Sequence, residues 1–163
     1  MTVTDVDKDP AALTLTITSE WDAPVERVWQ LWSDPRRLER WWGPPTHPAK
    51  VTEHDLRPGG TVAYCMTGPE GDEYRGCWNV GEVEAPHHLA FVDAFANADG
   101  TVNDDLPLTS ADISLSELDD GRTRMVMITT FPSPAAMEQV IAMGVEEGML
   151  QAMSQIDAVL AAG

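Results

Sequence analysis

The sequence predicts an α+β fold in which one antiparallel sheet packs against a long C-terminal helix. Three patterns support this prediction. A strand pattern near the N-terminus is followed by two short helical patterns, residues 49–131 carry only strand and turn patterns, and an amphipathic helix of about 27 residues closes the chain. Strands that are clustered together, with helices before and after them, are typical of α+β proteins.

The N-terminal elements follow from local signals. Residues 1–10 are polar, so we expect a flexible leader ahead of a single domain over residues 11–163. The strict alternation of residues 13–18 predicts a half-buried strand. Asp22 and Asp34, each followed closely by a proline, then mark the starts of two short helices.

Turn-forming residues divide the central region into strands. The loop Gly68–Asp72 has the composition of a hairpin turn. We expect its flanking strands to pair so that Tyr64 lies opposite Trp78 and Cys65 lies opposite Cys77. In a reducing cytoplasm these two cysteines are expected to be free thiols rather than a disulfide. The predicted strands cover residues 51–56, 61–67, 73–83, 89–95, 109–118 and 122–131.

The last predicted element is one continuous helix. Ser133 is a good N-cap and Pro134 suits the first helical position. Two glycines, Gly144 and Gly148, lie inside this helix, where each costs about 1 kcal/mol relative to alanine. That cost predicts a close approach of the sheet or of a ligand. The apolar stripe consists of Met137, Ile141, Val145, Met149, Ile156 and Leu160.

Charge and composition exclude several classes of function. The chain has 10 basic and 27 acidic residues, so its net charge is 10 − 27 = −17. Such a charge repels nucleic acids and anionic membranes. No apolar run is long enough to span a membrane, and the N-terminus lacks the pattern of a secretory signal, so we expect a cytoplasmic protein. No cofactor motif is present, and the four histidines have no partners at metal-ligand spacing.

Several segments carry a family resemblance. The run Ala23–Trp29 followed by Trp41–Pro44 resembles the opening of SRPBCC (START-like) domains, and more narrowly the branch named for homology to the activator of the heat-shock-protein-90 ATPase. Further matches, in order, are Asp55–Gly60, Gly76–Val80, Pro86–Leu89, Asp93–Gly100, Gly121–Met125, Phe131–Ser133 and Met143–Gly148. The resemblance implies a helix-grip fold: a curved sheet of six or seven strands around the C-terminal helix, with an apolar cavity between them.

We therefore predict that the chain binds an apolar or aromatic small molecule in this cavity. Three polar groups would orient the ligand: Tyr64, Asp93 and Glu147. The walls would be Met66, Trp78, Phe91, Phe95 and Met127, with Gly144 and Gly148 giving clearance. Ordinary core packing is the alternative for the aromatic and methionine residues.

Asp93 is the carboxylate that most needs an explanation. In its predicted strand it shares a face with Leu89, Phe91 and Phe95, and burying an unpaired carboxylate there is costly. It therefore binds a polar ligand group, pairs with a cation such as Arg75, or is turned to solvent by a bulge. Burial would raise its pKa. In the last helix, we expect Glu147 to lie near the sheet-facing stripe and Glu146 to be solvated.

Two other functions remain open at this point. One is a cyclase or hydrolase acting on a polyketide-like substrate, with Asp93 or Glu147 moving protons. The other is a cochaperone-like module whose acidic face docks a basic protein surface. We expect binding rather than catalysis and assign no catalytic residue, no metal ligand and no cofactor. The expected partner is a hydrophobic or aromatic small molecule, and a homodimer is kept open.

Overall fold

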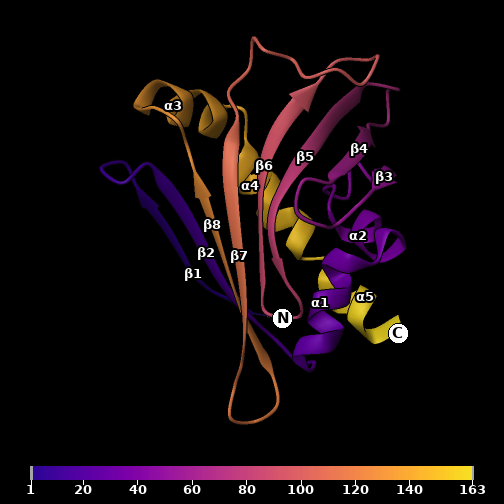
Figure 1. Ribbon diagram of the computed structural model, residues 1–163, viewed down its shortest axis with the longest axis vertical. Helices are drawn as coiled ribbons and strands as arrows, with labels where there is room; N and C mark the ends of the chain where they lie inside the picture. Colours follow the sequence, from indigo (N-terminus) through magenta and orange to yellow (C-terminus); the bar gives the residue numbers. More distant parts are fainter. Residues whose placement is uncertain (1, 163) are drawn as a thin grey trace.

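The computed structural model describes residues 2–162 and contains one eight-stranded antiparallel sheet with five helices on one of its faces (Figure 1). The spatial order of the strands is β1-β2-β8-β7-β6-β5-β4-β3. This is the predicted α+β helix-grip fold, with eight strands in place of six or seven. The elements are β1 (Thr2–Asp9), β2 (Thr14–Trp21), α1 (Val25–Ser33), α2 (Pro35–Trp41), β3 (Ala49–His54), β4 (Thr61–Thr67), β5 (Glu73–Glu84), β6 (His88–Ala96), β7 (Thr109–Glu117), β8 (Thr123–Thr130), α3 (Pro134–Ala142), α4 (Val145–Met153) and α5 (Ile156–Ala162).

The additional strand lies where a flexible leader was expected. Residues 2–9 form β1, which pairs with β2 along its length, so that expectation is wrong for this segment. Its polar composition is explained by its place at the edge of the sheet, where charged side chains discourage further strand pairing. Val3 still packs against the core, and Lys8 forms an ion pair with Glu146 of α4 at 3.0 Å.

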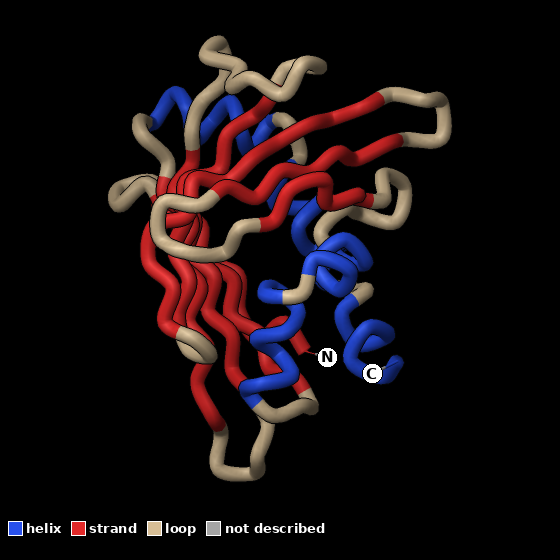
Figure 2. The backbone as a smooth tube through the Cα atoms, turned by 45° about the vertical axis from the view of Figure 1, so that its right-hand side comes forward, coloured by secondary structure: helices blue, strands red, loops and turns tan. Residues whose placement is uncertain are grey.

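Both short helices form, but only α2 begins as predicted: α1 begins at Val25 after Pro24, and Asp22 does not cap it. Asp34 caps α2 by accepting a hydrogen bond from the backbone N–H of Arg36, and Pro35 occupies the first turn. Figure 2 shows the helices gathered on the inner side of the strongly bent sheet.

No helix within residues 2–162 is long and apolar enough to cross a membrane.

The C-terminal region is not one helix, which corrects the sequence prediction. It is divided into α3, α4 and α5. Gly144 has a φ of +86°, a left-handed conformation that interrupts the helix and that glycine adopts without strain. The second interruption lies at Gln155, whose side-chain amide donates to the carbonyl of Gly43 at 2.6 Å. The chain thereby turns to follow the curved core while its apolar residues keep facing inward.

The β4–β5 hairpin also differs from the prediction. Tyr64 pairs with Gly76, and Cys65 pairs with Arg75 rather than with Cys77. The turn sets this register, because the backbone N–H of Gly68 donates to the carbonyl of Asp72 at 2.7 Å and closes a five-residue loop. The shift equals two residues, so every side chain keeps the face that its alternation predicts. Both cysteines are free.

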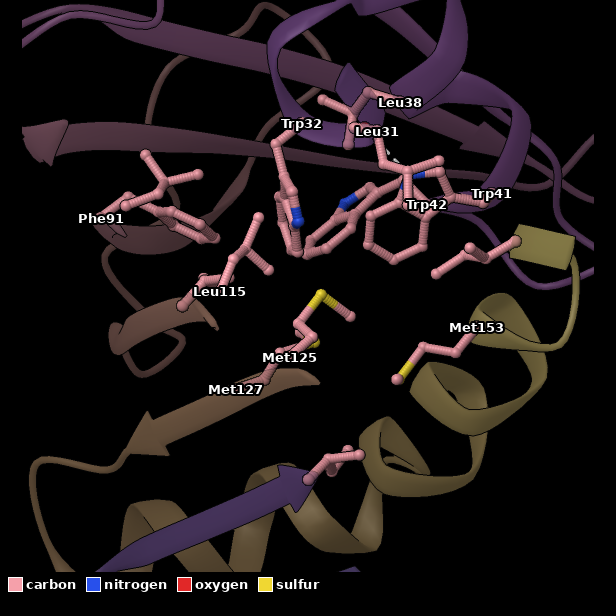
Figure 3. Packing of buried hydrophobic residues seen from close by; sticks show 14 of the residues in the cluster. Leu31, Trp32, Leu38, Trp41, Trp42, Phe91, Leu115, Met125, Met127 and Met153 are labelled. Carbon is pink, nitrogen blue, oxygen red and sulfur yellow. Dashed lines mark hydrogen bonds between the residues drawn. The ribbon is translucent and has the colours of Figure 1, made fainter. Parts of the chain in front are cut away.

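Aromatic side chains fill most of the space between sheet and helices. Trp32, Trp41 and Trp42 come from the α1–α2 region and meet Phe91, Met125 and Met127 of the sheet and Met153 of α4 (Figure 3). The rings of Trp78 and Phe91 stack with centroids 3.9 Å apart. Side chains of this size account for the packing of the region in which an apolar cavity was expected.

Candidate functional site

A small, partly open cavity of about 50 Å³ lies between the inner face of the sheet and the junction of α3 with α4. This volume accommodates a water molecule, whereas pockets for drug-sized ligands usually measure about 300–1,000 Å³. The cavity combines two polar groups from the sheet with apolar groups from both helices. Its lining residues are Tyr64, Asp93, Ala94, Phe95, Thr109, Thr129, Val140 and Val145.

The strand register brings Tyr64 to Asp93. Tyr64 faces Gly76 across the β4–β5 ladder, and Gly76 in turn faces Phe95 of β6. The ring of Tyr64 lies over Gly76 so closely that a Cβ at this position would collide with it. The tyrosine hydroxyl then donates a hydrogen bond to Oδ1 of Asp93 at 3.0 Å. Gly76 is thus the residue that makes this contact across three strands sterically feasible.

Asp93 faces the cavity without a basic partner. Arg75, the cation considered for it, bonds instead to Glu73 at 2.8 Å, so that alternative is wrong. Within residues 2–162, no lysine, arginine or histidine forms an ion pair with Asp93. Burial raises the pKa of Asp93 to about 7, although hydrogen bonds from Tyr64 and from the backbone N–H of Ala94 act in the opposite direction. The carboxyl group is therefore poised to change its charge near neutral pH.

The neighbouring titratable groups respond to the same environment. Burial, and secondly the negative charge of Asp93, raise the pKa of Tyr64 well above its usual value. Burial and the charge of Asp93 also raise the pKa of the Cys77 thiol. Tyr64 therefore stays protonated at physiological pH and acts as a hydrogen-bond donor.

The predicted site residues divide into two groups. Tyr64, Asp93 and Phe95 come together at the cavity, as grouped by the sequence. Trp78, Phe91 and Met127 are buried in the core, and Met66 packs against it while partly exposed, so none of these four lines the cavity.

The residues predicted on the last helix are arranged differently from the expectation. Glu147 is exposed, and Glu146 is the partly buried one that bonds to Lys8, which reverses the predicted orientations. A Cβ placed on Gly144 or Gly148 would meet nothing within 4 Å. No strand or side chain therefore lies close to the helix at either glycine, and the predicted close approach is wrong. The interruption at Gly144 explains the reversal, because it changes the rotation of α4 relative to α3.

Five lining residues were not predicted from the sequence: Ala94, Thr109, Thr129, Val140 and Val145. Thr109 is paired directly with Asp93 in the β6–β7 ladder, and Thr129 lies on β8. Val140 and Val145 flank Gly144 on α3 and α4. Alternation along each strand was the available signal for the threonines, whereas the valines become neighbours of the cavity through the helix interruption.

The uncovered face of the sheet has a wider, open depression of about 350 Å³. It is bordered by small and polar residues, including Asn79, Gly81, Ala90, Ser110 and Asp112. His47 contacts Asp72 at 2.8 Å, whereas His88 contacts both Asp112 at 2.9 Å and Glu82 at 3.4 Å. No group of three or more His, Cys, Asp or Glu residues in the described part of the chain could hold a metal ion.

A bent antiparallel sheet that holds C-terminal helices on its inner face, with two short helices closing one end, defines a START-like helix-grip protein. The family model described as "Activator of Hsp90 ATPase homolog 1-like protein" matches residues 22–161, and the chain belongs to this family. The resemblance noted in the sequence is therefore confirmed. No curated protein shows a significant match to the chain.

Solved structures agree with this assignment. The crystal structure of protein Ms6760 from Mycobacterium smegmatis is 51% identical, with a TM-score of 0.90 over 98% of this chain and 97% of that one. The solution structure of a protein from Arthrobacter aurescens is also 51% identical, with a TM-score of 0.94 over 99% and 94% of the two chains. A Staphylococcus epidermidis protein, 24% identical with a TM-score of 0.82 over 99% and 94%, shares the fold.

Proposed function

We propose that this protein binds an apolar or aromatic small molecule whose polar group contacts Asp93 and Tyr64. The observation that carries the proposal is a hydrogen-bonded carboxyl–phenol pair with no basic partner among the described residues, located in a cavity with otherwise mainly apolar walls. A few convergent polar groups in an apolar pocket are typical of small-molecule sites. They fix the orientation of a ligand, while burial of its apolar surface supplies affinity at about 25 cal/mol per Å².

A ligand larger than water requires the cavity to widen, and the helix junction offers a route. Val140 and Val145 lie on opposite sides of Gly144, so a rotation at this glycine would move α3 relative to α4. The same junction is poorly covered: Met143 is 50% exposed, and no atom lies within 4 Å of the Cβ position of Gly144. Movement at this point therefore breaks few packing contacts.

The proposal is tested by blocking the cavity. Native mass spectrometry of protein purified from its own host, followed by thermal shift against flavonoids, sterols, fatty acids and polyketides, identifies a ligand. Val145→Phe places a larger side chain at the cavity wall and should abolish its binding. Val126→Phe is the matched control, because Val126 lies between the inward-facing Met125 and Met127 and points to the opposite face of the sheet.

A true ligand at about 100 times its Kd adds about 2.7 kcal/mol of stability to the wild type and to Val126→Phe, and none to Val145→Phe. Equal stabilisation of both variants would show that binding occurs elsewhere and would refute the proposed site. No ligand in either experiment would instead favour a protein-binding role of the kind that the family's name describes.

A second candidate function is proton transfer on the bound molecule. It is favoured by the pKa of about 7 at Asp93, since a general acid or base works best near the ambient pH. Asp93→Asn would then abolish turnover of an identified ligand while leaving its binding measurable. Unchanged turnover in this variant would exclude Asp93 as the proton-transfer group.

A further inference from the structure

The carboxyl group of Asp93 is surrounded by groups that cannot neutralise it. Its hydrogen-bond partners are the hydroxyl of Tyr64 and the backbone N–H of Ala94, both of them neutral. Neutral donors reduce, but do not remove, the cost of holding a carboxylate away from water. A positively charged ligand group would supply the missing partner.

Two further observations favour a cation at this position. The aromatic rings of Tyr64 and Phe95 line the cavity, and the ring of Trp42 lies 5.9 Å from that of Tyr64. Aromatic faces attract organic cations, with the strongest effect where water is excluded. The net charge of −17 also attracts cations to the whole molecule and repels anions.

We propose that the ligand of this cavity carries a protonated amine, and that the contact with Asp93 selects organic cations with an apolar body over neutral or anionic molecules of the same shape. This inference rests on the proposed function and specifies the class of its ligand. The ammonium group donates hydrogen bonds to the Asp93 carboxylate, and the apolar body lies against the side of the cavity formed by Phe95, Val140 and Val145.

Proton balance makes the contact measurable. An ammonium group binding to protonated Asp93 must displace its proton to form the ion pair, so binding near pH 6 releases up to one proton to the buffer. With a pKa of about 7, Asp93 is about 3% ionised at pH 5.5 and about 90% ionised at pH 8. The affinity for an amine should therefore rise by up to about 30-fold between these pH values.

Few groups near Asp93 other than Asp93 itself could make the affinity for an amine depend on pH in this range. Tyr64 of β4 and Cys77 of β5 both have raised pKa values, so they remain neutral across this range. On α4, Glu146 is directed to Lys8 and Glu147 is exposed. The remaining cavity residues of β6, β7, β8, α3 and α4 do not titrate: Ala94, Phe95, Thr109, Thr129, Val140 and Val145.

The test compares benzylamine, phenethylamine and 4-phenylbutylamine with the alcohols and carboxylates of the same chain lengths. Each probe is titrated into the full chain at pH 5.5 and pH 8 by calorimetry in buffers of different ionisation enthalpy, with amide NMR shifts to locate the site. We expect an amine to bind at least about 10-fold more tightly than its alcohol at pH 8, with release of a proton near pH 6.

Variants separate the contribution of the Asp93 carboxyl to amine binding from the contributions of other groups. Asp93→Asn should remove the preference for the amine, whereas Asp104→Asn, in the exposed β6–β7 loop, should keep it. Tyr64→Phe removes a hydrogen bond that stabilises the carboxylate, so it should move the pH dependence of amine binding to higher pH. A role in packing alone would not produce that shift.

Three results would overturn the inference. Tighter binding of an alcohol or a carboxylate than of its amine at pH 8 would do so, as would an amine preference that survives in Asp93→Asn. In both cases the proposed small-molecule function would stand. If no probe shifts the amide signals of the cavity residues at either pH, the inference fails, and the proposed function is then decided separately by the ligand panel with Val145→Phe and Val126→Phe.

Discussion

Replacing Asp93 by asparagine should stabilise the protein at alkaline pH and much less at acidic pH. The pKa of Asp93 is raised from 3.8 to about 7 in the folded protein. Well below pH 3.8 both the folded and the unfolded states are protonated, so the raised pKa has no effect on stability. Between pH 4 and pH 7 only the folded state holds the proton, and the free energy of unfolding falls as the pH rises. Above pH 7 the full cost of the buried charge is present.

The size of the effect follows from the shift. About three pKa units correspond to at most about 4 kcal/mol, and the intermediate exposure of Asp93 as a whole residue lowers this figure. Over the accessible interval from pH 5 to pH 8, the stability of Asp93→Asn relative to wild type should increase by about 2–3 kcal/mol. The asparagine oxygen still accepts the hydrogen bond from Tyr64, so the geometry of the site is preserved.

Urea unfolding at pH 5 and pH 8 measures this difference directly. Asp104→Asn is the matched control, because Asp104 is exposed and forms no hydrogen bond or ion pair with any described residue. Its effect on the free energy of unfolding should agree at the two pH values within about 0.5 kcal/mol. If the stability difference between Asp93→Asn and wild type is the same at pH 5 and pH 8, Asp93 is not a carboxyl group buried without a cationic partner, and the reasoning is refuted.

Further substitutions test the packing around the cavity. Gly76→Ala should destabilise the protein by about 1–3 kcal/mol in urea unfolding and displace the ring of Tyr64, because the added Cβ occupies the space of that ring; wild-type stability would disprove the close approach. Gly144→Ala should cost about 1 kcal/mol, since its φ of +86° suits only glycine, whereas Gly148→Ala should gain about 0.5–1 kcal/mol inside α4. Thermal unfolding of Gly144→Ala and Gly148→Ala compares two positions that both have open space around the added Cβ but differ in backbone conformation. Equal shifts in Tm would contradict the claim that a side chain strains the left-handed backbone at residue 144.

The sequence is sufficient for much of the fold because alternation is a local property. Between its bulges, a strand places its side chains on the face that period two predicts. This held for β4 and for β5 up to Val80, where a bulge follows, even though the pairing of the two strands differs by two residues. The register depends on how the Gly68–Asp72 turn closes, which composition alone does not determine. The edge strand β1 was missed because polar edge strands resemble flexible termini.

The site depends on non-local features, so less of it could be predicted. Asp93, Tyr64 and Phe95 could be grouped because they share one face of the sheet. Trp78 and Phe91 share that face too, but they stack on each other, and Trp78 also contacts the rings of Trp32 and Trp42. The spacing of residues does not reveal these contacts. The orientations of the glutamates on α4 were missed because the helical period restarts after Gly144.

The most direct measurement of the central claim is the carbon-13 chemical shift of the Asp93 carboxyl across pH, recorded with and without a bound ligand. We expect a titration midpoint near pH 7 in the free protein and a displaced midpoint when a ligand occupies the cavity. A midpoint near the usual value of 3.8, or one that a bound ligand leaves unchanged, would contradict a ligand site built on Asp93.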